Sequence, residues 1–206
     1  MVADDEDNNT HMSNARVLSS QIESYTRNYN LERIFIDAYP QIATPGGARY
    51  PAVNQAIDRR VRNGAFIVNY TGHGGELGWA QERILDIPTI LAWDNAYAMP
   101  IFMTATCEFT RFDDPLRTSA GEHVLLNGNG GGIALLTTTR LVYSGPNFTL
   151  NQRFYDALFN RPEAEVVTRI GDIYRITKNN SISGSLPNHR NFSLIGDPAL
   201  PLALPQ

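Results

Sequence analysis

The sequence predicts an α/β fold in which a mostly parallel sheet lies between two layers of helices, a three-layer αβα sandwich. Segments typical of strands alternate along the chain with segments of helical periodicity, as in right-handed β-α-β units. Three strand segments are apolar almost throughout, as expected for strands covered on both faces: 65–70, 100–105 and 132–139. The chain has 206 residues, of which 42% are hydrophobic. This length suits one domain with a sizeable core.

The N-terminal half contains a strand end, two helices and a further strand. "VAD" after Met1 has the pattern of a strand end, so we expect the chain to be a fragment of a longer protein. A first helix is predicted because apolar residues recur at spacings of three and four: Ala15, Leu18, Ile22, Tyr25 and Tyr29. The run "RIFIDAY" (33–39) predicts a strand, and the glycine- and proline-rich "TPGGARYP" predicts a turn. A helix is expected over 52–64, ending at Gly64.

The C-terminal half adds three predicted helices and one more strand. The segment 118–127 carries Ser119 and Glu122 at the spacing of a capping box. Helical periodicity also covers 147–160 and 163–179. The glycine-rich "GNGGG" (128–132) predicts a turn into a strand, and 191–202 predicts a final strand and turn.

Composition excludes several classes of function. The formal net charge of −4 and the pI near 5.5 provide no basic surface for a nucleic acid. No apolar stretch is long enough to cross a membrane, and the acidic "MVADDEDNN" does not resemble a signal peptide. Because the chain has a single cysteine, it cannot form an internal disulfide.

Two apolar strands end on residues that can carry out chemistry. "NGAFIVNYTGHGG" (63–75) leads to His73, and "MPIFMTATCEF" (99–109) leads to Cys107. The carboxyl ends of parallel strands share one edge of a sheet, where active sites of such folds gather. A thiol with a pKa of about 8.5 needs a base or a positive field to become a nucleophile at neutral pH, and a histidine supplies either. We therefore expect a Cys-His pair, against the alternative that Cys107 is an inert buried residue.

The glycines around His73 fit this chemistry. Gly72, Gly74 and Gly75 let the backbone pass close to a substrate, and a free N–H beside the histidine can donate to a developing oxyanion.

At the level of motifs, the chain resembles the gingipain family of cysteine peptidases, in the caspase and gingipain clan. The resemblance is carried by "NYTGHGGELGWA", "TATCEF", "GGIALLTTTR" and "SLIGDPAL", and covers nearly the whole chain. Within the family, it is similar to the sortases of the type IX secretion system. It implies a caspase-like fold, with residues 1–206 forming a single catalytic subdomain, the second of two in such proteins.

The resemblance also implies roles for individual residues. His73 would be the base, Cys107 the nucleophile, and the N–H groups of Gly74 and Cys107 the oxyanion hole. An acid that supports the histidine would lie in "DDED", with Asp4, Asp5 and Glu6 as the candidates. The family's aspartate for basic P1 residues falls among Asp7, Asn8 and Asn9, which leaves the P1 preference open.

As a function, the resemblance implies a cysteine endopeptidase and sortase at the cell surface, associated with the outer membrane. It would cleave C-terminal secretion signals of type IX secreted proteins, form a thioacyl-enzyme and transfer the product to a lipopolysaccharide amine. Its partners would be these substrates, that acceptor and other components of the secretion system. Two alternatives remain: a hydrolytic gingipain-like peptidase, and an inactive docking module.

Other residues have weaker patterns. Glu76 and Trp79 are candidates for the substrate cleft, while Trp93 is expected in the core. No cofactor or metal is expected, because a site made of His73, Glu76 and Cys107 would have few nitrogen and sulfur ligands. "GHGG" lacks the spacing of a phosphate-binding loop, and the acidic N-terminus lacks that of a calcium loop. The remaining histidines are expected on the surface or in packing roles: His11, His123 and His189.

Overall fold

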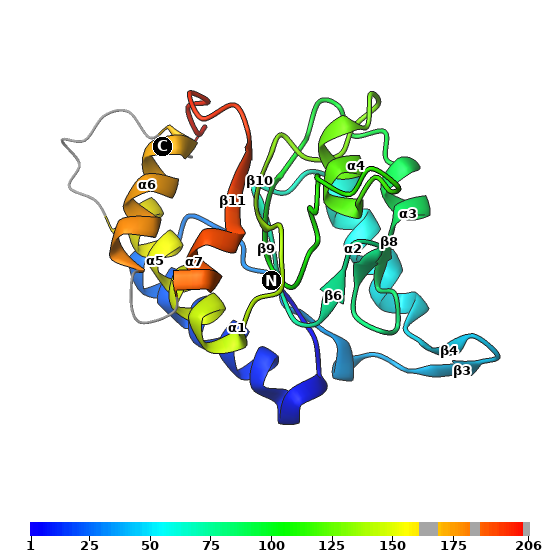
Figure 1. Cartoon of the computed structure of the whole chain (residues 1–206). Helices are drawn as coiled ribbons and strands as arrows, with labels where there is room; N and C mark the ends of the chain where they lie inside the picture. Colours follow the sequence, from blue (N-terminus) through cyan, green and yellow to red (C-terminus); the bar gives the residue numbers. More distant parts are fainter. Residues whose placement is uncertain (161–168, 182–185, 204–206) are drawn as a thin grey trace.

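A six-stranded sheet forms the centre of the molecule, with helices on both faces (Figure 1). A computed structural model of the chain describes residues 1–160, 169–181 and 186–203. Within these residues the strand order is β11-β10-β9-β5-β1-β2, and all neighbours are parallel except β10 and β11. The predicted αβα sandwich is confirmed. The strands are β1 (Val2–Ala3), β2 (Ile34–Phe35), β5 (Ile67–Thr71), β9 (Ile101–Ala105), β10 (Ala134–Thr138) and β11 (Phe192–Gly196).

Side chains of the central strands alternate between two apolar cores. In β9, Ile101 and Met103 belong to one core and Phe102 to the other, as the two-residue period of a strand requires. The first core is covered by α1 (Glu6–Tyr25), α5 (Ser144–Phe159) and α6 (Ile170–Asn180), with α7 (Leu186–Asn191) beside them. The second is covered by α2 (Pro51–Arg62), α3 (Ile87–Leu91) and α4 (Ala120–Leu126) (Figure 1).

Most predicted elements occur close to their expected positions. The three apolar runs form β5, β9 and β10, and the capping box of Ser119 and Glu122 begins α4. The helix expected over 163–179 is present from Ile170, and 163–168 lie outside the described residues. Within the described part of the chain, no helix combines the length and the apolar character needed to span a membrane.

Two predictions were wrong in extent. The strand expected over 33–39 ends at Phe35, because its partner β1 has only two paired residues, and Ile36–Ala38 form a 3-10 turn, η1. The first helix ends at Tyr25, where Thr26 turns to an extended backbone. Tyr29 therefore lies beyond the helix and stacks on Phe66, with ring centroids 5.7 Å apart.

Besides the central sheet, the described residues form two small antiparallel sheets. The predicted turn after η1 contains a hairpin, β3 (Ile42–Thr44) and β4 (Gly47–Arg49), which projects from the body of the molecule (Figure 1). Directly after β5, a three-stranded antiparallel sheet follows His73: β6 (Gly74–Gly75), β7 (Gly78–Trp79) and β8 (Leu85–Asp86).

Candidate active site

The sheet places His73 and Cys107 at equivalent positions on adjacent strands. β5 and β9 are parallel neighbours whose last paired residues are Thr71 and Ala105. His73 and Cys107 each follow two residues later. Since the main-chain N–H of Gly72 still donates to the carbonyl of Ala105 (3.4 Å), the two strands remain side by side as they leave the sheet.

The backbone of His73 is fixed by three hydrogen bonds. Its N–H donates to the buried carboxylate of Asp4 (2.9 Å). Its carbonyl accepts from the hydroxyl of Tyr70 (2.6 Å) and from the N–H of Ala80 (2.8 Å). This packing requires glycine at position 72, where a Cβ would lie 2.4 Å from that of Asp4. The loop around His73 is therefore held tightly.

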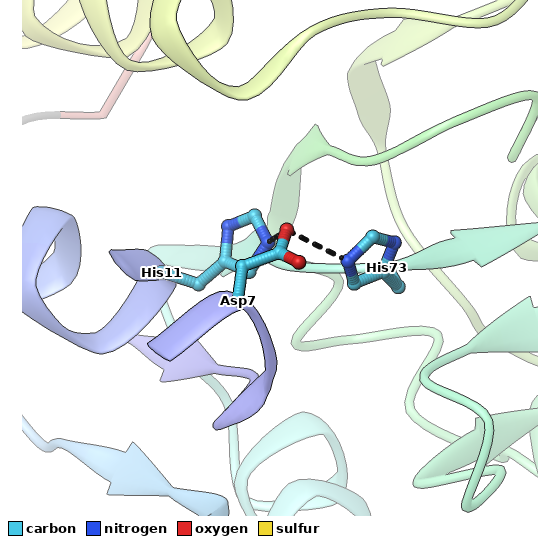
Figure 2. Close-up of side chains that lie close together, drawn as sticks. All are labelled: Asp7, His11 and His73. Carbon is cyan, nitrogen blue, oxygen red and sulfur yellow. Dashed lines mark hydrogen bonds and ion pairs between the residues drawn. The ribbon is translucent and has the colours of Figure 1, made fainter. Parts of the chain in front are cut away.

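The imidazole of His73 contacts a carboxylate from the start of α1. His73 Nε2 lies 2.9 Å from Asp7 Oδ2 (Figure 2). This hydrogen bond, together with the charge of His73, lowers the pKa of Asp7. Asp7, Asn8 and Asn9 all have positive φ values, of 56°, 55° and 62°. Such a left-handed turn is rare outside glycine, and it occurs where α1 presents Asp7 to the site.

The carboxylate nearest to the imidazole of His73 is not one of the three candidates from the sequence, Asp4, Asp5 and Glu6. Asp4 binds the main chain of His73, and Asp5 accepts from the hydroxyl of Tyr50 (3.1 Å). Glu6 is more distant than Asp7, with Oε2 3.9 Å from His73 Nε2. Sequence reasoning missed Asp7, because the left-handed turn shifts which residue of "DDED" faces the imidazole.

A second histidine, His11, lies against the first. It is 5% exposed, and its ring centroid is 5.3 Å from that of His73 with the planes at 89°. His11 Nε2 is 3.3 Å from Asp7 Oδ2, but neither ring nitrogen makes a well-formed hydrogen bond to any described residue. Burial lowers the pKa of His11 and favours its neutral form. His11 is buried, in agreement with the expected packing role, but its ring also contacts the imidazole of His73.

The remaining two histidines lie elsewhere. His123 is half-buried on α4, and His189 Nε2 lies 2.7 Å from the carbonyl of Lys178.

The thiol of Cys107 points to a different neighbour. Cys107 is half-buried, and its S–H donates to the carbonyl of Val142 at 3.6 Å, in the loop between β10 and α5. In the described structure no hydrogen bond joins the thiol to His73, so the sequence expectation of a close sulfur–imidazole contact remains a prediction. The next residue, Glu108, has a φ of 50°, which marks a sharp turn directly after the cysteine.

Gly74 offers a main-chain donor beside His73. The Ala80 N–H to His73 carbonyl bond makes residues 73 and 80 a hydrogen-bonded pair of the β6–β7 ladder. Because such pairs alternate along an antiparallel ladder, the 74–79 pair is not hydrogen-bonded, and the Gly74 N–H points away from β7. A Cβ at Gly74 would lie 2.7 Å from both the Gly78 carbonyl oxygen and Thr106 Oγ1.

The two residues expected to line a cleft have other roles. Trp79 is completely buried and stacks on Tyr70 with ring centroids 4.4 Å apart, so its predicted place in an open cleft is wrong. Glu76 accepts from Arg111 (2.8 Å) and Arg117 (3.3 Å). These ion pairs join the loop after His73 to the loop after Cys107. Trp93 is buried, as predicted.

Comparison with known proteins agrees with this arrangement. The family model described as peptidase family C25 matches residues 1–203. The Arg-specific cysteine proteinase gingipain R (RGPB) has a TM-score of 0.73 at 17% identity, covering 98% of this chain and 46% of that chain. The complex of Porphyromonas gingivalis RgpB pro- and mature domains has a TM-score of 0.76 at 14% identity, covering 98% and 47%.

A structure described as a protease has a TM-score of 0.67 at 15% identity, covering 88% of this chain and 44% of that chain. The chain therefore spans about half the length of these structures, and the likeness shows the fold. No curated protein sequence is significantly similar to this chain.

Proposed function

The chain belongs to peptidase family C25, and from this premise we propose that it is the catalytic unit of a cysteine peptidase in which Cys107 is the nucleophile and His73 the base. The observation that carries the proposal is the shared register of the two residues, each two positions beyond the Thr71–Ala105 pair of neighbouring strands. The anchoring of His73 by Asp4, Tyr70 and Ala80 supports it, because catalysis requires groups held in place before the substrate arrives.

In the proposed mechanism, the Cys107 thiol leaves the carbonyl of Val142, gives its proton to His73 and attacks a peptide carbonyl. The N–H groups of Gly74 and Cys107 stabilise the oxyanion. His73 then protonates the leaving amine as the C–N bond breaks, and a thioacyl-enzyme remains. Asp7 orients the imidazole and stabilises its charged form.

For the specific activity within this family, we propose a PorU-like sortase of the type IX secretion system that acts at the cell surface. Its substrates are proteins with C-terminal secretion signals, and its acyl acceptor is an amine of a surface lipopolysaccharide. The resemblance of "NYTGHGGELGWA" and "TATCEF" supports this assignment. Leu77 supplies exposed apolar surface in the loop after His73, which fits a site that disfavours water.

Two other outcomes are distinguished by specific observations. If water takes the acyl group, the protein is a hydrolytic gingipain-like peptidase. An inactive docking module is favoured by the hydrogen bond from the Cys107 thiol to Val142, since that contact directs sulfur to a carbonyl rather than to a base.

Alkylation tests the Cys-His pair directly. We expect iodoacetamide to label Cys107 of the folded chain at pH 6 to 7 faster than a free thiol. His73→Ala should slow labelling on the order of 100-fold, whereas the control His123→Ala should not. Labelling at the rate of a free thiol, unaffected by His73→Ala, would favour the docking module.

Transfer is tested in the full-length protein that contains this chain. Given a substrate with a C-terminal secretion signal and an added amine, the released product should carry the amine in a yield that rises with amine concentration. Cys107→Ala should abolish both cleavage and transfer. A product that is always the free acid would replace the sortase with a hydrolytic peptidase.

A further inference from the structure

The proposed mechanism leaves one buried polar side chain without a role. His11 is 5% exposed, and within the described residues neither ring nitrogen makes a well-formed hydrogen bond: Nδ1 has no partner, and Nε2 has only its 3.3 Å contact with Asp7. An unpartnered polar group in the interior costs free energy, so a native structure normally gives such a group a partner or a function.

His11 lies within a group of three potential metal donors. Among the described residues, His11 Nε2 and His73 Nε2 lie 3.3 Å and 2.9 Å from the same atom, Asp7 Oδ2. All three ligand atoms are within 4.8 Å of one another. Figure 2 shows the Asp7 carboxylate between the two rings, with α1 supplying two of the side chains and the loop after β5 the third.

The two distances from Asp7 Oδ2 suit a small transition-metal ion. A tetrahedral Zn²⁺ with ligand bonds of about 2.0–2.1 Å keeps its donor atoms roughly 3.3 Å apart. Two imidazoles and a carboxylate are typical zinc ligands, whereas calcium and magnesium prefer sets made of oxygen atoms. Three protein ligands also leave a fourth position for water.

The supporting structure fixes the donors from both sides. Asp7 lies in the left-handed turn at the start of α1, and this turn brings its carboxylate within 3.3 Å of His11, four residues later. His73 is held by its main-chain hydrogen bonds to Asp4, Tyr70 and Ala80. The three side chains are therefore brought together before any ion arrives, which lowers the cost of binding.

We propose that Asp7, His11 and His73 form a site for a divalent transition metal of the zinc class, and that the ion inhibits the enzyme by occupying His73 Nε2. When Nε2 of a neutral imidazole is ligated, its one proton lies on Nδ1. Neither ring nitrogen can then accept the proton of Cys107, and the imidazolium that Asp7 would stabilise cannot form. The proposed metal binding depends only on the geometry of these three side chains. The inhibitory part rests on the proposed function, because it requires His73 to act as the base for Cys107.

Direct binding is the first test. Titration of Zn²⁺ into the chelator-treated whole chain, followed by calorimetry, should give one ion per chain. His11→Gln should weaken binding by at least about 100-fold, since even the outer partners of metal ligands typically contribute 10- to 100-fold. The matched control His123→Gln should bind as the unaltered chain does. Binding unaffected by His11→Gln would overturn the site.

A second variant covers the case in which the buried His11→Gln chain fails to fold. Asp7 has a side chain that is 54% exposed, so Asp7→Asn keeps the surface and removes the ligand charge. It should also weaken Zn²⁺ binding at least tenfold. X-ray absorption of the zinc-loaded chain should show nitrogen and oxygen ligands without sulfur. A sulfur ligand, or loss of binding in Cys107→Ser, would instead place the ion on the Cys-His pair and overturn the proposal.

The rate of Cys107 alkylation then tests inhibition. Zn²⁺ should slow alkylation of the unaltered chain, and the ratio of rates without and with zinc should approach one in His11→Gln. Stoichiometric binding without slower alkylation would overturn the inhibitory part. If Cys107 is unreactive even without metal, the proposed peptidase function fails, while the binding result still decides the metal site.

Discussion

The ends of β5 and β9 carry the two proposed reacting groups, but the structure holds them very differently. His73 has three hydrogen bonds to its main chain and a fourth contact from its imidazole to Asp7. Among the described residues, the thiol of Cys107 makes one long S–H bond, to the carbonyl of Val142. The proposed base is therefore held in place before a substrate arrives, whereas the proposed nucleophile would have to leave the carbonyl of Val142 before it could react. Substitutions on the two sides should therefore have unequal effects.

The largest effect is expected from adding one methyl group beside His73. In Gly74→Ala, the new Cβ would lie 2.7 Å from the Gly78 carbonyl oxygen and Thr106 Oγ1, so the strand must shift and carry the oxyanion donor with it. Peptide cleavage should fall on the order of 100-fold or more. Gly75→Ala is the matched control, because its Cβ would meet nothing within 4 Å. Equal cleavage rates for the two variants would remove Gly74 from the oxyanion hole.

A smaller effect should follow from neutralising Asp7. Asp7→Asn removes the charge that faces His73 Nε2, and we expect Cys107 alkylation at pH 7 to slow by about tenfold. Glu6→Gln is the control, since Glu6 lies 3.9 Å from the same nitrogen and should matter less. Because the pKa of Asp7 is lowered in the folded chain, its support should persist above its ordinary pKa and disappear as pH falls through the lowered value. A larger loss in Glu6→Gln would identify Glu6 as the supporting acid.

Next in size is the dependence of stability on pH at His11. Burial lowers the pKa of His11, so below the ordinary value of about 6.5 the unfolded chain binds a proton that the folded chain resists. In metal-free buffer, the free energy of unfolding should therefore decrease as pH falls below 6.5. Urea denaturation should show a flatter pH dependence for His11→Gln than for the control His123→Gln. The same slope in both variants would mean that another group is responsible.

The smallest effect, on the free energy of unfolding, is expected from breaking the ion pairs between the loops that follow His73 and Cys107. Glu76 links the loops through Arg111 and Arg117, whose side chains are partly exposed and therefore screened by water. Glu76→Gln should reduce the free energy of unfolding by about 1 kcal/mol. Urea denaturation should show less change in Glu108→Gln, since Glu108 lies 3.8 Å from Arg111. A loss of several kcal/mol in Glu76→Gln would mean that the two loops depend on each other far more than their contacts indicate.

Much of the fold could be predicted because its signals are local. Apolar runs placed β5, β9 and β10, and the capping box placed the start of α4. Consecutive parallel strands also brought His73 and Cys107 to one edge of the sheet. These inferences depend only on periodicity and on the order of elements along the chain.

The detailed site could not be predicted, because it depends on side-chain direction. Which residue of "DDED" faces His73 is decided by the left-handed turn at Asp7, Asn8 and Asn9, and no glycine signals that turn. His11 has no sequence signal beyond its spacing of four from Asp7. Trp79 follows the glycine-rich loop at His73 and was a candidate for the substrate cleft, but its ring packs inward onto Tyr70.

The position of β1 between β5 and β2 links chemical competence to the order of folding. Asp4 and Asp7 reach His73 across 69 and 66 residues of sequence, and contacts of such long range form slowly because the intervening chain must first be ordered. While β1 is undocked, the chain has a thiol but no oriented base. If the proposed Cys-His pair is correct, a nascent or partly folded copy therefore lacks activity until the first dozen residues have docked.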